Sequence, residues 1–125
     1  ARVPSLEAYL DLPGERDKAA RHLIPPAILK RGDAEACLAH LLERYAFVGV
    51  QEHYALCFRA LTALVAMPAD PVLRANVALE EEPAPELTPA LAQRIREANP
   101  LDSALHAAML ARWEAVRESL ARYLA

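Results

Sequence analysis

The sequence predicts a mostly α-helical segment with one short strand, which would pair with a sheet supplied from outside the segment. Three observations lead to this fold class. Apolar residues recur every three or four positions over most of the chain, which is typical of amphipathic helices. Residues 45–50 form one short aromatic and β-branched run, and no second strand is evident. A lone buried strand leaves its backbone groups without partners. We therefore expect a missing N-terminal part, a partner chain or a second copy to supply the sheet.

Length and composition limit the possible functions. The 125 residues fit a single segment, 1–125, and a hydrophobic content of 54% is enough to build a core. The formal net charge of −3 disfavours a nucleic-acid partner. No apolar run is long enough to span a membrane and no signal peptide is evident, so we expect a soluble, cytoplasmic protein.

The first third of the chain gives short elements. We expect a helix at residues 5–9, a turn at Leu12–Pro13–Gly14 and a helical piece at 15–24. Pro25 and Pro26 should stop that piece, because proline cannot donate a backbone hydrogen bond.

The middle of the chain predicts the order helix, strand, helix. Asp33 is a suitable N-cap for a helix over residues 34–45. The strand follows at 47–50, with apolar residues on both faces, as in strands buried on both sides. Gln51 then opens a helix that ends before Pro68. The expected apolar stripes of the two helices are Ala34, Cys37, Leu38, Leu41, Leu42 and Tyr45, then Tyr54, Cys57, Phe58, Leu61, Leu64 and Val65.

A long loop is predicted at residues 68–87. Four prolines remove backbone donors there, and the run Glu80–Glu81–Glu82 adds charge repulsion. We interpret the acidic run as a solvated surface. Long loops in compact domains are often functional, which draws attention to Arg74 and Asn76 at its centre.

Two helices are predicted after the loop. Thr88 and Pro89 have the sequence of an N-cap followed by a first helical residue, and a helix should run over 89–98. Asn99 and Pro100 repeat this pattern before a helix over 100–123. Its apolar face should contain Leu101, Leu105, Met109, Trp113, Val116, Leu120 and Leu124.

Residues 41–52 carry a resemblance to a known family. Their sequence, Leu-Leu-Glu-Arg-Tyr-Ala-Phe-Val-Gly-Val-Gln-Glu, resembles the C-terminal half of carbohydrate-type sulfotransferases. In that family a helix leads into a strand reading Phe-Val-Gly, which is followed by a Glu and an aromatic-bearing helix. Further matches follow in order, and they are Arg74 and Asn76, Pro89, Asn99, Asp102 and Trp113.

The resemblance implies a nucleotide-kinase-like α/β fold with a parallel sheet, of which this mostly helical segment would form the C-terminal part. It also implies transfer of a sulfuryl group from 3'-phosphoadenosine-5'-phosphosulfate to a hydroxyl of a carbohydrate or other small acceptor. The family's N-terminal strand-loop-helix that holds the donor has no counterpart in this chain. We therefore expect the chain alone to be inactive, and we assign no catalytic residue within it.

Arg74 and Asn76 are the candidate donor-binding residues. The resemblance implies that their loop lies at the mouth of the nucleotide site, where a guanidinium fork and an amide suit phosphate or sulfate oxygens. The alternative is a surface arginine and a turn-forming asparagine. For Glu52 and Asp102 the favoured interpretation is stabilisation of a helix start, because carboxylates there complement the helix dipole.

Four residues have spacing that imitates a zinc site, namely Cys37, His40, His53 and Cys57. Both cysteines belong to apolar stripes, so we interpret them as core residues and expect no metal. None of the four histidines has a sequence context that would activate a nucleophile. The alternative to the enzyme is a non-catalytic helical module that binds a protein partner or associates with itself.

Overall fold

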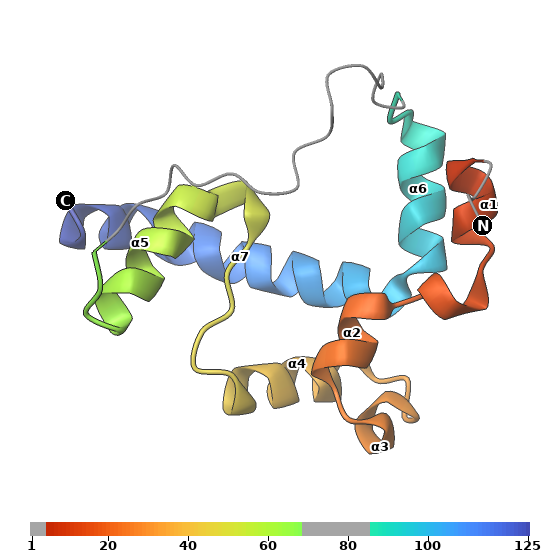
Figure 1. The fold of residues 1–125 in the computed structure, drawn as a ribbon, viewed down its shortest axis with the longest axis horizontal. Helices are drawn as coiled ribbons and strands as arrows, with labels where there is room; N and C mark the ends of the chain where they lie inside the picture. Colours follow the sequence, from red (N-terminus) through yellow and green to blue (C-terminus); the bar gives the residue numbers. More distant parts are fainter. Residues whose placement is uncertain (1–4, 69–85) are drawn as a thin grey trace. The chain divides into compact units, whose positions relative to one another are not determined.

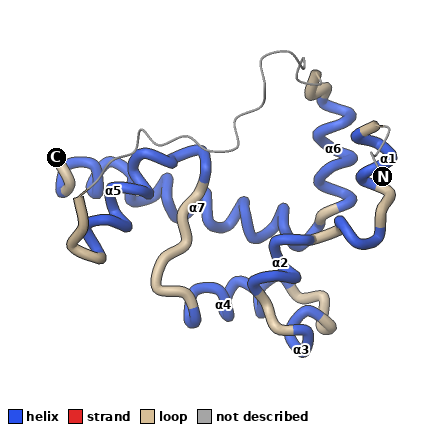
Figure 2. Tube along the Cα trace, in the orientation of Figure 1, coloured by secondary structure: helices blue, strands red, loops and turns tan. Residues whose placement is uncertain are grey.

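The structure is a computed structural model, and it describes residues 5–68 and 86–125. In these residues the chain is mostly α-helical, and Figure 2 shows no strand among them. The elements are, in order, α1 (Leu6–Leu10), the short 3-10 helix η1 (Pro13–Glu15), α2 (Lys18–Leu23), α3 (Pro26–Leu29), α4 (Ala34–Arg44), the 3-10 helix η2 (Gln51–His53), α5 (Tyr54–Leu64), α6 (Pro89–Ala98) and α7 (Pro100–Tyr123). None of the helices in the described ranges has the length and apolar character needed to cross a membrane.

The chain divides into two compact units. Unit 1 contains Ala1–Val48 and Thr88–Ala108, and unit 2 contains Gly49–Leu87 and Met109–Ala125. Helix α7 therefore belongs to unit 1 up to Ala108 and to unit 2 from Met109 onward.

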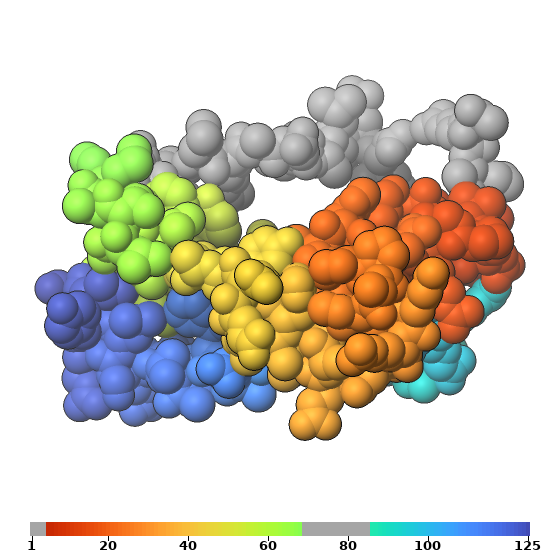
Figure 3. Space-filling model, turned by 90° about the horizontal axis from the view of Figure 1, so that it is seen from below, coloured from red at the N-terminus to blue at the C-terminus, as the bar shows by residue number. Residues whose placement is uncertain are grey.

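In unit 1, α6 lies beside α1, as two perpendicular views show (Figures 1 and 3). The Arg94 guanidinium of α6 is 2.9 Å from an oxygen of Asp11, the residue that ends α1. The buried apolar residues of this unit come from α2 and the residue after it, from α4 and from α7, and they are Ala20, Ile24, Cys37, Leu41 and Leu105. The core thus joins the N-terminal third of the chain to the start of α7.

In unit 2 the buried apolar side chains are Val50, Cys57, Met109 and Trp113. Thr62 is also buried, and its hydroxyl is satisfied within α5, where it donates to the Phe58 and Arg59 carbonyl oxygens at 3.0 Å. The Arg59 guanidinium donates to the carbonyl of Leu124, which ties α5 to the end of the chain.

The predicted caps of α4 and α6 are confirmed. An Asp33 carboxylate oxygen accepts from the Glu35 N–H at 2.9 Å and from the Ala36 N–H at 3.4 Å. The Thr88 hydroxyl accepts from the Leu91 N–H at 3.2 Å. Each helix also begins where the sequence places it, because an Asp or Thr at this position satisfies donors that no residue within the helix can reach.

Helix α3 is an element that the sequence analysis missed. The predicted stop at Pro25 and Pro26 is confirmed, because α2 ends at Leu23. Pro26 also occupies the first position of α3, where the missing N–H of proline costs nothing. The chain then turns at Gly32, whose φ of +63° is readily adopted only by a residue without a Cβ.

The predicted strand at 47–50 is wrong, and α4 and α5 are connected by an irregular extended segment. Val50 does have extended dihedrals, with φ −124° and ψ 146°. Its buried N–H donates to the Cys57 sulfur at 3.4 Å, and the thiol donates back to the Val50 carbonyl at 3.6 Å. The His53 N–H reaches the same carbonyl at 3.3 Å. Because α5 and η2 satisfy both backbone groups of Val50, this residue needs no neighbouring strand.

Two predicted apolar stripes are only partly buried. Leu105, Met109 and Trp113 face the core at intervals of four residues, but Val116 on the same helix is 47% exposed. Leu64 and Val65, at the end of α5, are 61% and 52% exposed. Helical periodicity predicts which residues share a face, and only the neighbours in space decide how much of that face is covered.

Candidate functional site

Arg74 and Asn76, the predicted donor-binding residues, lie outside the described residues. The acidic run Glu80–Glu81–Glu82 and most of the predicted loop 68–87 also lie there. Their roles stay predictions. The candidate site that the structure does describe is a polar cluster in unit 1, between the start of the chain and the start of α7.

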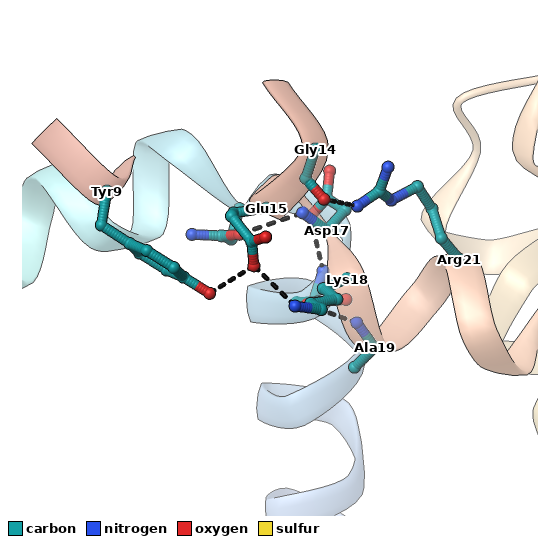
Figure 4. Close-up of polar contacts among 9 residues, drawn as sticks. Tyr9, Gly14, Glu15, Asp17, Lys18, Ala19 and Arg21 are labelled. Atoms are coloured by element: carbon teal, nitrogen blue, oxygen red, sulfur yellow. Dashed lines mark hydrogen bonds and ion pairs between the residues drawn. The ribbon is translucent and has the colours of Figure 1, made fainter. Parts of the chain in front are cut away.

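A hydrogen-bonded chain of three side chains forms one edge of this cluster (Figure 4). The Tyr9 hydroxyl and the Lys18 ammonium both donate to Oε2 of Glu15, the ammonium at 2.7 Å. The three residues come from α1, η1 and α2. They fasten consecutive short helices, each too short to be stable alone.

The contacts among these three side chains favour an ionised Glu15 and a protonated Tyr9 and Lys18. The hydrogen bond to Glu15 raises the pKa of Tyr9 above its ordinary value of 10.0. The hydrogen bonds from Lys18 and then from Tyr9 lower the pKa of Glu15 below 4.5. Glu15 in turn raises the pKa of Lys18 above 10.5. A general acid or base works best with a pKa near the operating pH. All three pKa shifts lead away from neutrality, so this chain suits fastening better than proton transfer.

The centre of the cluster is Asp17, which is 9% exposed and adopts the left-handed conformation with φ 46° and ψ 44°. Its N–H donates to Oδ1 of Asn99 at 3.0 Å. Its carboxylate oxygen Oδ1 accepts from the N–H groups of Leu101 and Asp102 at 2.9 and 3.0 Å. Asp17 therefore caps the N-terminus of α7, although more than eighty residues separate the two in sequence.

Asp102, in α7, in turn caps the start of α2. Its Oδ1 accepts from the Ala20 N–H at 2.7 Å and its Oδ2 from the Ala19 N–H at 3.1 Å. These amides are in the first turn of α2. Asp102 also lies in the first turn of its own helix, as the favoured interpretation of the sequence held. That interpretation missed the bonds to a second helix.

The prediction that Asn99 caps α7 holds for its backbone carbonyl but not for its side chain. Its carbonyl accepts the first backbone bond of α7, from Ser103 at 3.0 Å, as an N-cap carbonyl does. Its side chain does not cap α7, because Oδ1 accepts from Asp17 and Nδ2 donates to the Ile95 carbonyl at 2.9 Å. The capping side chain of α7 is that of Asp17 instead.

A small pocket lies beside this cluster and is lined by Tyr9, Leu10, Glu15, Arg16 and Asn99. Its volume of about 40 Å³ holds a few water molecules. A drug-sized ligand requires several hundred Å³. The pocket is therefore too small for a nucleotide donor.

Unit 2 contains a second polar contact between separate elements. His53 Nε2 and Glu114 Oε1 are 2.6 Å apart, joining η2 to α7. Arg117 Nε lies 3.6 Å from the other oxygen of Glu114. Glu52 occupies the first turn of η2, the position in which the sequence analysis favoured a role at a helix start.

The cysteine and histidine spacing that imitates a zinc site does not produce one among the described residues, where no group of three or more potential ligand side chains occurs. Cys37 and Cys57 are free, buried thiols. Burial, followed by the charges of Asp33 and Asp17, raises the pKa of the Cys37 thiol above its ordinary value of 9.0 and so keeps it protonated. Comparison of the chain with family models, curated proteins and solved structures finds no match.

The sequence analysis missed Asp17 altogether. A sequence signal does exist, because Asp is a common N-cap and tolerates the left-handed conformation better than most residues. That signal predicts a cap on the adjacent helix α2. Only the packing of α2 against α7 directs the carboxylate to the other helix.

Proposed function

We propose that this chain is the helical C-terminal segment of a sulfotransferase-like domain and that it supports the domain's active site without carrying the reacting groups. The complete domain would transfer a sulfuryl group from 3'-phosphoadenosine-5'-phosphosulfate to a hydroxyl of a carbohydrate or other small acceptor. The observation that carries the proposal is the family-like series running from residues 41–52 through Asn99, Asp102 and Trp113.

The positions of the helices support this proposal. Helix α4 ends at Arg44, just before the Phe-Val-Gly string, and α5 begins at Tyr54, just after Glu52. Asn99 ends α6, and Asp102 lies in the first turn of α7. A helix before the Phe-Val-Gly string and a helix after it agree with what the resemblance implies, although the segment at 47–50 is extended and irregular instead of a strand.

The chemistry of the described side chains supports a role without catalysis. The carboxylates of Asp17 and Asp102 are engaged in capping, and the pocket beside them is too small for the donor. Sulfuryl transfer, like phosphoryl transfer, depends on donors positioned around developing charge. In this proposal such donors come from the rest of the domain, with Arg74 and Asn76 as the chain's own contribution.

The test is a substitution of Arg74 in the full-length protein. Arg74→Ala should remove a charge-assisted contact worth about 1.5–3 kcal/mol, a tenfold to hundredfold loss in kcat/KM for sulfate transfer. Arg74→Lys should recover part of the loss, because an ammonium keeps the charge but not the fork. The control Glu81→Ala, in the same loop, should leave kcat/KM within about twofold. Equal kcat/KM values for Arg74→Ala and the unmodified protein would show that the loop has no role in donor binding.

A binding measurement tests the other half of the proposal. The 125-residue chain alone should not bind the desulfated donor, 3'-phosphoadenosine-5'-phosphate, at micromolar concentrations, because the residues that cradle it are absent from this sequence. Micromolar affinity in calorimetry would show that the chain contains a donor site of its own.

A non-catalytic helical module is the second candidate. The observation that favours it is the exposure of three large apolar residues at the end of α5, namely Leu64 at 61%, Val65 at 52% and Met67 at 64%. Such residues, when contiguous, mark protein-interaction surfaces. Under this alternative the chain would sediment as a concentration-dependent oligomer or with a protein partner, and the full-length protein would transfer no sulfate.

A further inference from the structure

The starts of α2 and α7 are capped by each other. In an ordinary N-cap the side chain satisfies its own helix, as Asp33 does for α4. Here Asp17 precedes α2 but binds two N–H groups of α7, and Asp102 lies in α7 but binds two N–H groups of α2. Four donors that a helix start leaves unsatisfied thus depend on the other helix.

The backbone at the junction adds to this dependence. The Asp17 N–H is held by the Asn99 side chain, and the Asn99 amide also binds the Ile95 carbonyl at the end of α6. Asp17 stays in its left-handed conformation, which is unfavourable for a residue with a Cβ, within this set of bonds. Loss of the Asp17 carboxylate would leave two donors of α7 without partners, and loss of the Asp102 carboxylate would leave two donors of α2 without partners.

We infer that α2 and the first turn of α7 open and close as one unit, with Asp17 and Asp102 as a reciprocal latch. If the first turn of α7 frays, Asp102 leaves Ala19 and Ala20 and α2 loses its only described cap. If α2 frays, Asp17 leaves Leu101 and Asp102. Local opening in a folded protein commonly involves such contiguous units. The latch is independent of sulfate transfer and concerns how the N-terminal helices attach to the C-terminal helix.

Amide hydrogen exchange on the full chain tests the inference. Asp17→Gly removes the carboxylate and adopts a φ of +46° without strain. It should accelerate exchange at the Leu101 and Asp102 amides, which it caps directly. It should also accelerate exchange at Ala19 and Ala20, whose own acceptor Asp102 is still present, by about tenfold. Acceleration confined to Leu101 and Asp102 would show two independent caps and overturn the inference.

Two further variants control for loss of folding. Asp17→Asn keeps Oδ1, the only oxygen that Asp17 uses toward α7, and should exchange as the unmodified chain does. If it behaved like Asp17→Gly, the capping oxygen would not be the cause. Asp33→Gly is the matched control, since it removes a local cap, and its effect should be confined to the Glu35 and Ala36 amides.

The two buried thiols give a second measurement. Asp102→Ala should open unit 1 and accelerate the labelling of Cys37 by a thiol reagent by about tenfold, while Cys57 in unit 2 changes less than about twofold. This substitution leaves Asp33 and Asp17, whose charges act on Cys37, in place. Unchanged labelling of Cys37 would contradict the latch, and equal acceleration of both thiols would show global unfolding instead.

Discussion

At the scale of single residues, Glu15, Asp17 and Arg21 hold short backbone segments of unit 1 together. One carboxylate oxygen of Glu15 accepts from the Tyr9 hydroxyl and the Lys18 ammonium, and one oxygen of Asp17 accepts from two backbone N–H groups of α7. Arg21 donates to the carbonyl of Gly14 in the same region. Such contacts are specific in direction, so they fix how short helices join where apolar burial alone would not.

The pKa shifts around Glu15 predict how this contact depends on pH. The folded pKa of Glu15 lies below its ordinary value of 4.5, so its stabilising contribution is present above pH 4.5 and is lost as the pH falls through the folded pKa. The pKa values of Tyr9 and Lys18 lie above 10.0 and 10.5, so their contributions are present below those values and are lost as the pH rises through the folded pKa values.

Glu15→Gln should therefore lower the midpoint of thermal unfolding by a constant amount through the neutral range. The difference from the unmodified chain should begin to shrink below about pH 4.5, where Glu15 becomes protonated in the unfolded state, and should vanish once the pH has fallen below the lower folded pKa. Glu7→Gln removes another carboxylate, in the first turn of α1, and is the matched control for the change in net charge. A difference that stays the same down to pH 2 would exclude this ion pair as its source.

At the scale of elements, the segment between α4 and α5 shows how a helical protein accommodates an extended stretch. Buried backbone groups need partners, and strands usually obtain them from neighbouring strands. Val50 obtains them from the Cys57 thiol and the His53 amide. The cysteine is thus both an apolar core residue and a hydrogen-bonding group.

Cys57→Ala should consequently destabilise the chain more than Cys37→Ala does. Both substitutions remove a buried sulfur, but only Cys57→Ala leaves the buried N–H of Val50 without its acceptor. An unsatisfied buried donor costs about 1–3 kcal/mol, which should appear as the difference between the two variants in urea unfolding. Equal losses would mean that the contact with sulfur adds nothing beyond packing.

At the scale of the whole molecule, α7 supplies core residues to both units. Leu105 is buried in unit 1, whereas Met109 and Trp113 are buried in unit 2. A helix is cooperative along its length, because each backbone bond spans four residues. We therefore expect global unfolding of one unit in urea to be accompanied by unfolding of the other.

Leu105→Ala tests this expectation. Truncation of a buried leucine costs about 2–5 kcal/mol. The fluorescence of Trp113, the one tryptophan of the sequence, reports on unit 2, and far-ultraviolet circular dichroism reports on all the helices. Both probes should show the same lower urea midpoint. Arg112→Ala, on the exposed face of α7, should change the free energy of unfolding by less than about 0.5 kcal/mol. A fluorescence midpoint unaffected by Leu105→Ala would show that the units unfold separately.

The sequence by itself determined that the long helices form and where α4, α6 and α7 begin. For α5 the expected start at Gln51 is wrong, because residues 51–53 form the 3-10 helix η2 and α5 spans Tyr54–Leu64. Asp33, Thr88 and the prolines at 89 and 100 act through local geometry, and α4, α6 and α7 begin where these residues place them. Tertiary structure decided what each polar residue binds. Val50 lies in a run with the composition of a strand, but its N–H donates to a thiol. Asp17 precedes one helix but caps another. Periodicity and capping depend on residues within one turn, whereas these partners are separated by up to 85 residues and become neighbours only when the helices pack.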